Sequence, residues 1–192
     1  MTTFRVLHVC TGNICRSPLG ERLMRAGLRE RLGEAATVFD VRSAGTLGNL
    51  GQPMEPFALT TLAGLGQDGS DFGATLLVED LVAGADLVLA ATREHRAAAV
   101  TLHPRAARKT FTLREFDRLL SVVDTEALPT GDLVARAQAI VLAAAAQRGL
   151  VRPERPGDDD ITDPYRGPEA GFTATGALIA ATLQRPLDLL AG

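Results

Sequence analysis

Cys10 and Arg16 stand close together in the stretch Cys10-Thr11-Gly12-Asn13-Ile14-Cys15-Arg16-Ser17-Pro18. A cysteine thiolate is a strong nucleophile, and amide dipoles beside a guanidinium favour the thiolate over the thiol. The planar fork of Arg16 can hold two phosphate oxygens at once and stabilise charge as a phosphoryl group moves. The hydroxyl of Ser17 is suited to donate a hydrogen bond to the sulfur. These residue types indicate attack on a phosphate group by Cys10.

The segments on either side of this stretch must position it. The β-branched, apolar run over 6–9 predicts a buried strand, and Pro18 followed by regularly spaced leucines predicts an amphipathic helix over 18–32. Residues 10–17 therefore form a strand-to-helix loop. Such a loop, with Gly12 to relax its backbone, can turn its N–H groups inward above the positive end of the helix. A tetrahedral oxyanion such as phosphate would fit there.

A cysteine and an arginine at this spacing are weak evidence alone, and a buried structural cysteine with a surface arginine is the plain alternative. The full motif over 10–18, however, strongly resembles the phosphate loop of the low-molecular-weight protein tyrosine phosphatases, and it lies near the N-terminus as in that family. The resemblance covers residues 4–118 and 161 to the end. It implies catalytic Cys10 and Arg16, and a phosphate-binding loop made of Thr11, Gly12, Asn13, Ile14, Cys15, Arg16 and Ser17.

Two further stretches are similar to the family. Ser43-Ala44-Gly45-Thr46 matches a segment whose serine supports the phosphate loop from a neighbouring strand, although an ordinary turn is the alternative. Asp163-Pro164 matches the general acid of the family. Cysteine catalysis needs such a group, which protonates the leaving oxygen and then activates water. The neighbouring Asp158, Asp159 and Asp160 are expected to be solvated loop charges.

The residues that would contact the organic group of the substrate are Tyr165, Ile14 and their neighbours. Tyr165, the only tyrosine of the chain, resembles the aromatic lip of the family's cleft, and Ile14 matches tyrosine-directed members, whereas members acting on phosphoarginine tend to have threonine there. Two positions depart from the family: Leu47-Gly48-Asn49 lacks an aromatic residue, and Arg166 follows Tyr165. Because an aromatic wall grips a phosphotyrosine ring, these departures leave the substrate open.

Cys10 and Cys15 are the only cysteines. A loop that wraps an anion can bring its ends within reach of a disulfide, and the resemblance implies that such a pair can form a reversible bond; Cys15 as a small buried hydrophobic residue is an equal alternative. The histidines at 8, 95 and 103 show no metal-ligand spacing, so neither a metal nor another cofactor is predicted. We expect His95 on the surface, in the first turn of a helix.

Strands and helices alternate along the chain, which predicts a doubly wound α/β domain. The predicted strands cover 6–9, 36–41, 86–91 and 109–112, and the predicted helices cover 18–32, 54–64, 76–83, 92–100, 113–120, 133–148 and a last one from Glu169 that Pro186 bends or ends. The resemblance implies a three-layer α/β/α sandwich around a four-stranded parallel sheet in the order 2-1-3-4, with the phosphate loop after strand 1. We expect one domain over 1–192, with an extra helical segment at about 121–160.

Composition narrows the function classes. With a net charge of −3 and a pI near 5.6, the chain lacks the basic footprint of a nucleic-acid-binding protein, and no apolar run has membrane-spanning length. We expect a cytoplasmic phosphatase that hydrolyses phosphate monoesters, above all protein phosphotyrosine, through a cysteinyl-phosphate intermediate. Its substrate would be a phosphoprotein or a small phosphate ester, and a cognate tyrosine kinase its partner. The alternatives are an arsenate reductase on the same scaffold, a phosphoarginine phosphatase and a non-enzymatic phosphate-binding module. The oligomeric state is open.

Overall fold

The sheet at the centre of the molecule has four parallel strands in the order β2-β1-β3-β4, as predicted. The computed structural model describes residues 3–48, 50–155 and 157–192, so Asn49 lies outside the described residues. The strands are β1 (Phe4–Cys10), β2 (Phe39–Gly45), β3 (Leu87–Ala90) and β4 (Thr110–Thr112). The strand order reverses between β1 and β3, which is where ligands bind in open parallel sheets.

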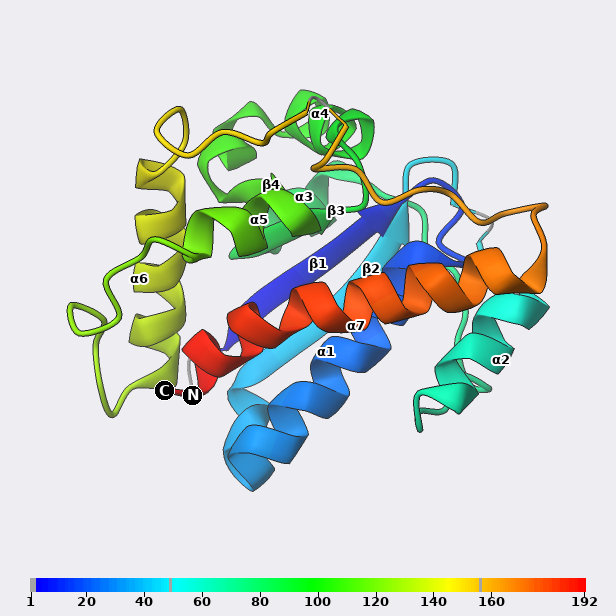
Figure 1. Ribbon diagram of the computed structural model, residues 1–192, viewed down its shortest axis with the longest axis horizontal. Helices are drawn as coiled ribbons and strands as arrows, with labels where there is room; N and C mark the ends of the chain where they lie inside the picture. The colour runs from blue at the N-terminus through cyan, green and yellow to red at the C-terminus, as the bar shows by residue number, and fades with distance from the viewer. Residues whose placement is uncertain (1–2, 49, 156) are drawn as a thin grey trace.

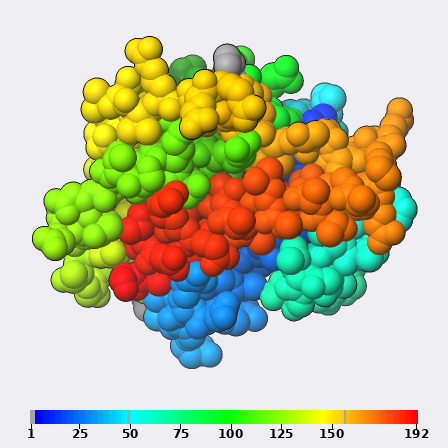
Figure 2. Space-filling model, viewed as in Figure 1, coloured from blue at the N-terminus to red at the C-terminus, as the bar shows by residue number. Residues whose placement is uncertain are grey.

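Helices cover both faces of the sheet and make three layers (Figure 1). One layer contains α1 (Arg16–Leu32), α5 (Leu113–Leu120) and α7 (Glu169–Ala191), and the other contains α3 (Glu79–Gly84) and α4 (Arg93–Leu102). Further helical segments lie at the margins: η1 (Gly33–Val38), α2 (Pro56–Gly64), η2 (Pro104–Lys109) and α6 (Leu133–Ala146). In Figure 2, α7 lies across the viewed face and hides most of the sheet. None of the helices in the described part of the chain combines the length and apolar character needed to cross a membrane.

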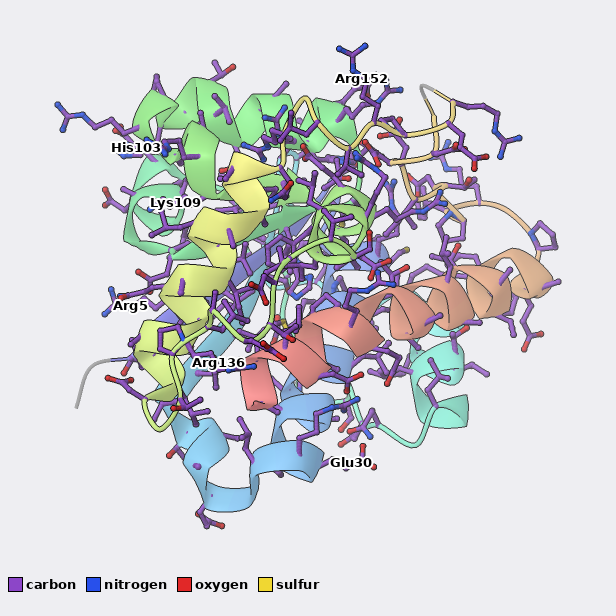
Figure 3. All side chains as sticks on the ribbon, turned by 60° about the vertical axis from the view of Figure 1, so that its left-hand side comes forward. Arg5, Glu30, His103, Lys109, Arg136 and Arg152 are labelled. Atoms are coloured by element: carbon purple, nitrogen blue, oxygen red, sulfur yellow. The ribbon has the colours of Figure 1, made fainter. Side chains whose placement is uncertain are left out.

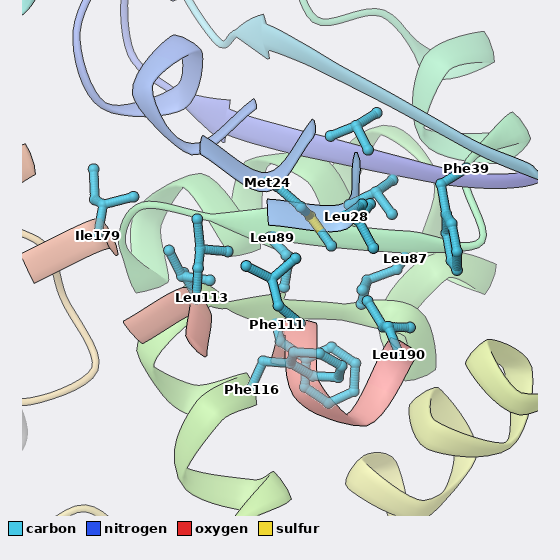
Figure 4. Close-up of a cluster of buried hydrophobic side chains, with 14 of the residues drawn as sticks. Met24, Leu28, Phe39, Leu87, Leu89, Phe111, Leu113, Phe116, Ile179 and Leu190 are labelled. Atoms are coloured by element: carbon cyan, nitrogen blue, oxygen red, sulfur yellow. The ribbon is translucent and has the colours of Figure 1, made fainter. Parts of the chain in front are cut away.

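The hydrophobic core follows the alternation of the strands. Phe4 and Val6 face the layer of α1 and α7, whereas Leu7 and Val9 face α3 and α4. Figure 4 shows the larger cluster, in which side chains from α1, α5 and α7 meet the sheet; its labelled members include Met24, Leu28, Phe111, Phe116, Ile179 and Leu190. Full burial of each such side chain contributes about 1.5–3 kcal/mol. This core holds the carboxyl end of β1, and hence the loop after it, in a fixed place.

The predicted second strand was wrong in its bounds. Residues 33–38 form η1, and the strand runs from Phe39 to Gly45, in register with Phe4 to Cys10 of β1. Pairing with β1 outweighs the local preference of residues 36–38, because the backbone hydrogen bonds of a buried strand need partners. Ser43, Ala44 and Gly45 therefore belong to a strand and not to an ordinary turn.

Pro186 does not end the last helix, which continues to Ala191. Leu183, Leu187 and Leu190 are buried on the same helix, so their packing offsets the hydrogen bond that the proline removes. Two helices begin at side-chain caps: the Thr92 side chain accepts from the backbone of His95, and Asp132 accepts from the first turn of α6.

The predicted helix within the extra segment is α6, and it ends at Ala146. It packs against α5, α7 and η2. Arg136 points from α6 toward the carboxyl end of α7, where its Nε donates to the carbonyl of Leu189 at 2.6 Å (Figure 3). A cation at the end of a helix also interacts favourably with the helix dipole. The segment is thus attached to the same core as the rest of the chain.

Candidate active site

The loop between β1 and α1 is fastened to the end of β2. Thr46 donates its N–H to the carbonyl of Cys10, and Leu47 donates to that of Thr11, both at 2.9 Å. Gly45 lies so close to this loop that a Cβ atom there would stand 2.5 Å from the carbonyl oxygen of Thr11. Only glycine therefore allows β2 and the loop to approach in this way.

A buried hydrogen-bond network holds the nucleophile candidate. The Sγ atom of Cys10 lies 3.0 Å from Ser17 Oγ, and Asn13 Nδ2 donates to Ser17 Oγ and to Ser43 Oγ, both at 2.8 Å. Asn13 has a φ of 55°, a left-handed conformation that asparagine tolerates better than most residues. Its Oδ1 atom accepts from the backbone N–H of Thr75 at 2.7 Å. These three hydrogen bonds of the Asn13 side chain brace the loop from within.

Glu21 completes this network, and the sequence analysis missed it. The residue is buried, and Ser43 Oγ donates to its Oε2 at 2.5 Å while Arg25 Nη1 pairs with its Oε1 at 3.0 Å. A buried carboxylate is stable only with such partners. The i, i+4 spacing of Glu21 and Arg25 was visible in the sequence, but their contact with Ser43 depends on how α1 crosses the sheet.

Arg16 is buried and donates hydrogen bonds to three residues. Its Nη1 donates to the carbonyl of Ile161 at 3.1 Å, and its Nη2 donates to Asp163 Oδ2 at 2.7 Å and to Thr11 Oγ1 at 3.3 Å. Its Nε is buried and has no hydrogen-bond partner among the described residues. A buried N–H without a partner is costly, so this position favours an acceptor such as a phosphate oxygen.

These side chains open into one cleft of about 240 Å³ at the carboxyl end of β1. The residues that line the cleft are Cys10, Thr11, Gly12, Ile14, Cys15, Arg16, Leu47, Asp163 and Tyr165. Leu47 and Tyr165 are 72% and 49% exposed, so they form its rim. The guanidinium of Arg166 lies 5.3 Å from the Tyr165 ring. The structure therefore brings together the predicted nucleophile, arginine, acid and aromatic lip, with Ser43 supporting the loop from behind.

The expectation that His95 is a surface residue was wrong. His95 is buried; its Nε2 hydrogen-bonds to Thr11 Oγ1 at 2.8 Å, and its Nδ1 hydrogen-bonds to Thr92 Oγ1 at 2.7 Å. Burial, with the nearby Arg16 charge, lowers the pKa of His95 to about 4, so the ring is neutral at pH 7. The error has a tertiary cause. The first turn of α4 packs next to the loop that contains Thr11, and no local sequence pattern indicates this contact.

The expectation for the acidic run 158–160 was also wrong in part. Asp159 is buried and pairs with Arg118 at 2.8 Å, and Asp160 pairs with Arg93 at 3.0 Å. Among the described residues, the side chain of Asp158 bonds only to the neighbouring Arg155. The arginine partners lie on α4 and α5, far away in the sequence. The sequence around residues 158–160 therefore does not indicate that two of these carboxylates are paired.

Cys15 lines the cleft with a free thiol, as Cys10 does. Burial, and then the charge of Cys10, raises the pKa of Cys15 to about 12. Cys15 therefore stays a protonated thiol at neutral pH and behaves as a small apolar side chain toward the core. The described residues contain no cluster of histidine, cysteine and carboxylate side chains that could hold a metal ion.

The sequence of this chain matches one family model and several known proteins. The model of the family described as low molecular weight phosphotyrosine protein phosphatase matches residues 5–126. The chain is 37% identical over 105 residues to the low molecular weight protein-tyrosine-phosphatase Etp of Escherichia coli, covering 55% of this chain and 66% of that protein, just under two thirds. It is 35% identical over 111 residues to the protein-arginine-phosphatase of Bacillus subtilis, covering 58% and 71%. A low molecular weight protein-tyrosine-phosphatase of Streptomyces coelicolor is 32% identical over 174 residues, covering 88% and 83%.

Solved structures show the same architecture. A mutant of YwlE from B. subtilis superposes with a TM-score of 0.70 at 25% identity, covering 99% of this chain and all of that one. A low molecular weight protein tyrosine phosphatase from T. tengcongensis gives a TM-score of 0.69 at 28% identity, covering 97% and 99%.

Proposed function

Because this chain belongs to the low molecular weight phosphotyrosine protein phosphatase family, we propose that it hydrolyses phosphate monoesters through a cysteinyl-phosphate intermediate. The observation that carries the proposal is the single cleft lined by Cys10, Arg16 and Asp163. A phosphate oxygen held there would give the Nε of Arg16 a partner. The catalytic and binding roles of these residues are part of the proposal.

In the first step Cys10 Sγ attacks phosphorus, so that the sulfur–phosphorus bond forms as the bond to the ester oxygen breaks. Asp163 gives its proton to the leaving oxygen. Arg16 and the loop N–H groups, over residues 11–17, hold the other phosphate oxygens and stabilise their charge. Ser17 Oγ lies 3.0 Å from the sulfur, and a hydrogen bond donated by this hydroxyl would stabilise the sulfur of Cys10 as the nucleophile.

In the second step Asp163, now a carboxylate, accepts a proton from water as that water attacks phosphorus. The sulfur–phosphorus bond breaks, and inorganic phosphate and the Cys10 thiolate are released. Ser17 stabilises the sulfur as leaving group. The cycle returns Asp163 to its acid form and needs no oxidant or reductant.

We propose protein phosphotyrosine as the substrate class. Tyr165 offers an aromatic face to a phenyl ring at the rim, and Ile14 supplies apolar contact deeper in the cleft. A panel of phosphotyrosine, phosphoserine and phosphoarginine peptides tests this choice. Since one relative is named a protein-arginine-phosphatase, faster turnover of phosphoarginine would contradict it.

Phosphotyrosine in protein requires a tyrosine kinase, so we also propose such a kinase as partner. We propose a cytoplasmic location as well, and cell fractionation checks the location.

The covalent step is tested with Cys10→Ser. The variant should lose turnover of an aryl phosphate and still bind inorganic phosphate or vanadate, because the loop N–H groups and Arg16 remain. Steady-state kinetics and calorimetric titration measure the two properties. Retention of more than a few per cent of the wild-type rate would exclude Cys10 as the nucleophile.

We further propose that peroxide converts Cys10 to a sulfenic acid, which Cys15 then captures as a disulfide with loss of water. Both cysteines line the same cleft, which supports the pairing. The high pKa of Cys15 makes the capture slow at pH 7, since the thiolate is the reacting form. Mass spectrometry after mild peroxide treatment should find a Cys10–Cys15 link; two separate sulfenic acids would leave Cys15 with a packing role alone.

We propose, too, that residues 1–192 act as one catalytic domain, with 121–160 as an added segment.

A further inference from the structure

Asp160 makes an unusual number of contacts for a half-exposed loop residue. Its Oδ1 accepts the backbone N–H of Arg93, the first residue of α4, at 2.8 Å. The Nε and Nη2 atoms of the same arginine reach both carboxylate oxygens, at 3.0–3.3 Å. One carboxylate thus grips the start of α4 through its backbone and its side chain together.

The next residues connect this contact to the catalytic groups. Ile161, which is buried, donates its N–H to the carbonyl of Ala91 at the end of β3 at 2.8 Å, and its own carbonyl accepts from Arg16 Nη1. Two residues later, Asp163 accepts from Arg16 Nη2. The acid-bearing segment, coloured orange in Figure 1, runs across the carboxyl ends of the strands before it enters α7.

The same helix start holds the other side of the cleft. α4 carries His95, whose ring hydrogen-bonds to Thr11 of the phosphate loop. Asp160 therefore connects the segment of Asp163 to the helix that braces the phosphate loop. An exposed ion pair adds little to the stability of a fold, so stability alone is a weak reason for this arrangement. A bidentate contact that also includes a backbone N–H constrains the relative position of Asp160 and Arg93, even where it contributes little to the free energy of unfolding.

We propose that Asp160, paired with Arg93, is a positioning residue that holds the acid Asp163 in register with Arg16. The inference rests on the proposed function, because it assigns Asp163 the acid role. If Asp160 is lost, Asp163 moves relative to the leaving oxygen while the phosphate loop keeps its shape. Displacement of an acid by a fraction of its hydrogen-bond reach reduces the rate without abolishing it.

The test compares Asp160→Ala, Asp160→Asn and Arg93→Ala with Asp158→Asn, whose carboxylate bonds to the nearby Arg155. For Asp160→Ala we expect kcat on a phosphotyrosine peptide to fall about tenfold, less than the ~10²–10⁴ of losing an acid outright. On a highly activated aryl phosphate, which needs little protonation, the loss should stay below about threefold. Inhibition by inorganic phosphate should change less than about twofold. Arg93→Ala, which keeps the backbone N–H bond to Asp160, should show the same pattern with a smaller loss, and the double variant should be no slower than Asp160→Ala, because the arginine side chain acts through Asp160.

A structural readout accompanies the kinetics. Hydrogen exchange at the Ile161 amide should speed up in Asp160→Ala and stay as in the wild type in Asp158→Asn. Equal losses on both esters, activity within twofold of wild type on both, or unchanged exchange at Ile161 would each overturn the positioning role. If Asp160→Ala does not fold, Asp160→Asn, which keeps an acceptor for the Arg93 N–H, carries the same comparison with a smaller expected loss. A wild-type chain that hydrolyses neither ester would overturn the proposed function instead.

Discussion

Arg16 shows why a guanidinium and not an ammonium is needed at the start of α1. Two of its nitrogens bind the protein, at Ile161 and Asp163, and the third, Nε, is buried without a partner among the described residues. A lysine has a single charged nitrogen and could not make these contacts in a fixed fork. The arginine thus ties the phosphate loop to a segment 147 residues later in the chain and still offers an N–H to an oxyanion.

The acid role of Asp163 predicts a dependence on the leaving group. Asp163→Asn should slow hydrolysis of a phosphotyrosine peptide by roughly 10²–10⁴-fold, the usual contribution of general acid catalysis, and affect a highly activated aryl phosphate much less. Steady-state kinetics on both substrates measures the difference. Asp158→Asn is the matched control and should be nearly silent on both. A uniform loss on the two esters would place the proton donor elsewhere.

At the scale of elements, the register of β1 and β2 decides the shape of the phosphate loop. Cys10 is paired with Gly45, so the last residue of β2 lies under the loop backbone. The loop then bends over β2 and enters α1, whose amino end provides N–H groups and a positive dipole for an anion. Two strands and one helix together make the cradle, and no single element contains it.

This arrangement predicts a large effect for Gly45→Ala. The new Cβ would lie 2.5 Å from Thr11 O and 2.8 Å from Asn13 N, both backbone atoms that must move. We expect unfolding by urea to show a loss of about 1–3 kcal/mol, the usual cost of overpacking, and phosphate binding to weaken. Gly64→Ala, at the end of α2 with nothing within 4 Å, is the control and should be neutral or slightly stabilising. Equal behaviour of the two variants would contradict the close approach.

At the scale of the whole molecule, two neutral histidines are buried on opposite sides of the sheet. His8 faces α1, where its ring lies against Gly20 and 3.4 Å from Met24 Sδ, and His95 lies on α4. Burial lowers the pKa of His8 to about 3, and burial with the Arg16 charge lowers that of His95 to about 4. In the unfolded chain both titrate near 6.5.

Folding stability should therefore fall as the pH drops below about 6.5. There the unfolded chain binds protons that the folded protein does not, so each histidine reduces the unfolding free energy by up to about 1.4 kcal/mol per pH unit until its folded pKa is reached. Urea unfolding at pH 7, 6 and 5 measures this slope. His8→Asn should be less stable at pH 7, since it fills less volume, but its slope should be smaller. An unchanged slope would mean that His8 binds its proton equally in the folded and the unfolded chain, which would contradict the lowered pKa.

The motif over 10–18 and its flanking patterns predicted β1, the loop and α1, because strand and helix periodicity are local properties of the chain. Caps such as Thr92 and Asp132 were predictable for the same reason, since a cap contacts only the first turn of its own helix. The parallel sheet also follows from the alternation of strands with helices. The general-acid role of Asp163 was expected from the resemblance rather than from any spacing in the sequence.

Only the folded chain decided what depends on contacts between distant segments. Pairing with β1 moved the start of β2 to Phe39, and docking of α4 buried His95 beside Thr11. The carboxylates Asp159 and Asp160 have no local partner, yet each meets an arginine from another helix. A charged or polar side chain has the same sequence pattern whether it faces water or a distant partner, because its environment is set by the elements that pack around it. Composition and periodicity therefore determined the elements of this protein, and tertiary packing determined which of their polar side chains meet.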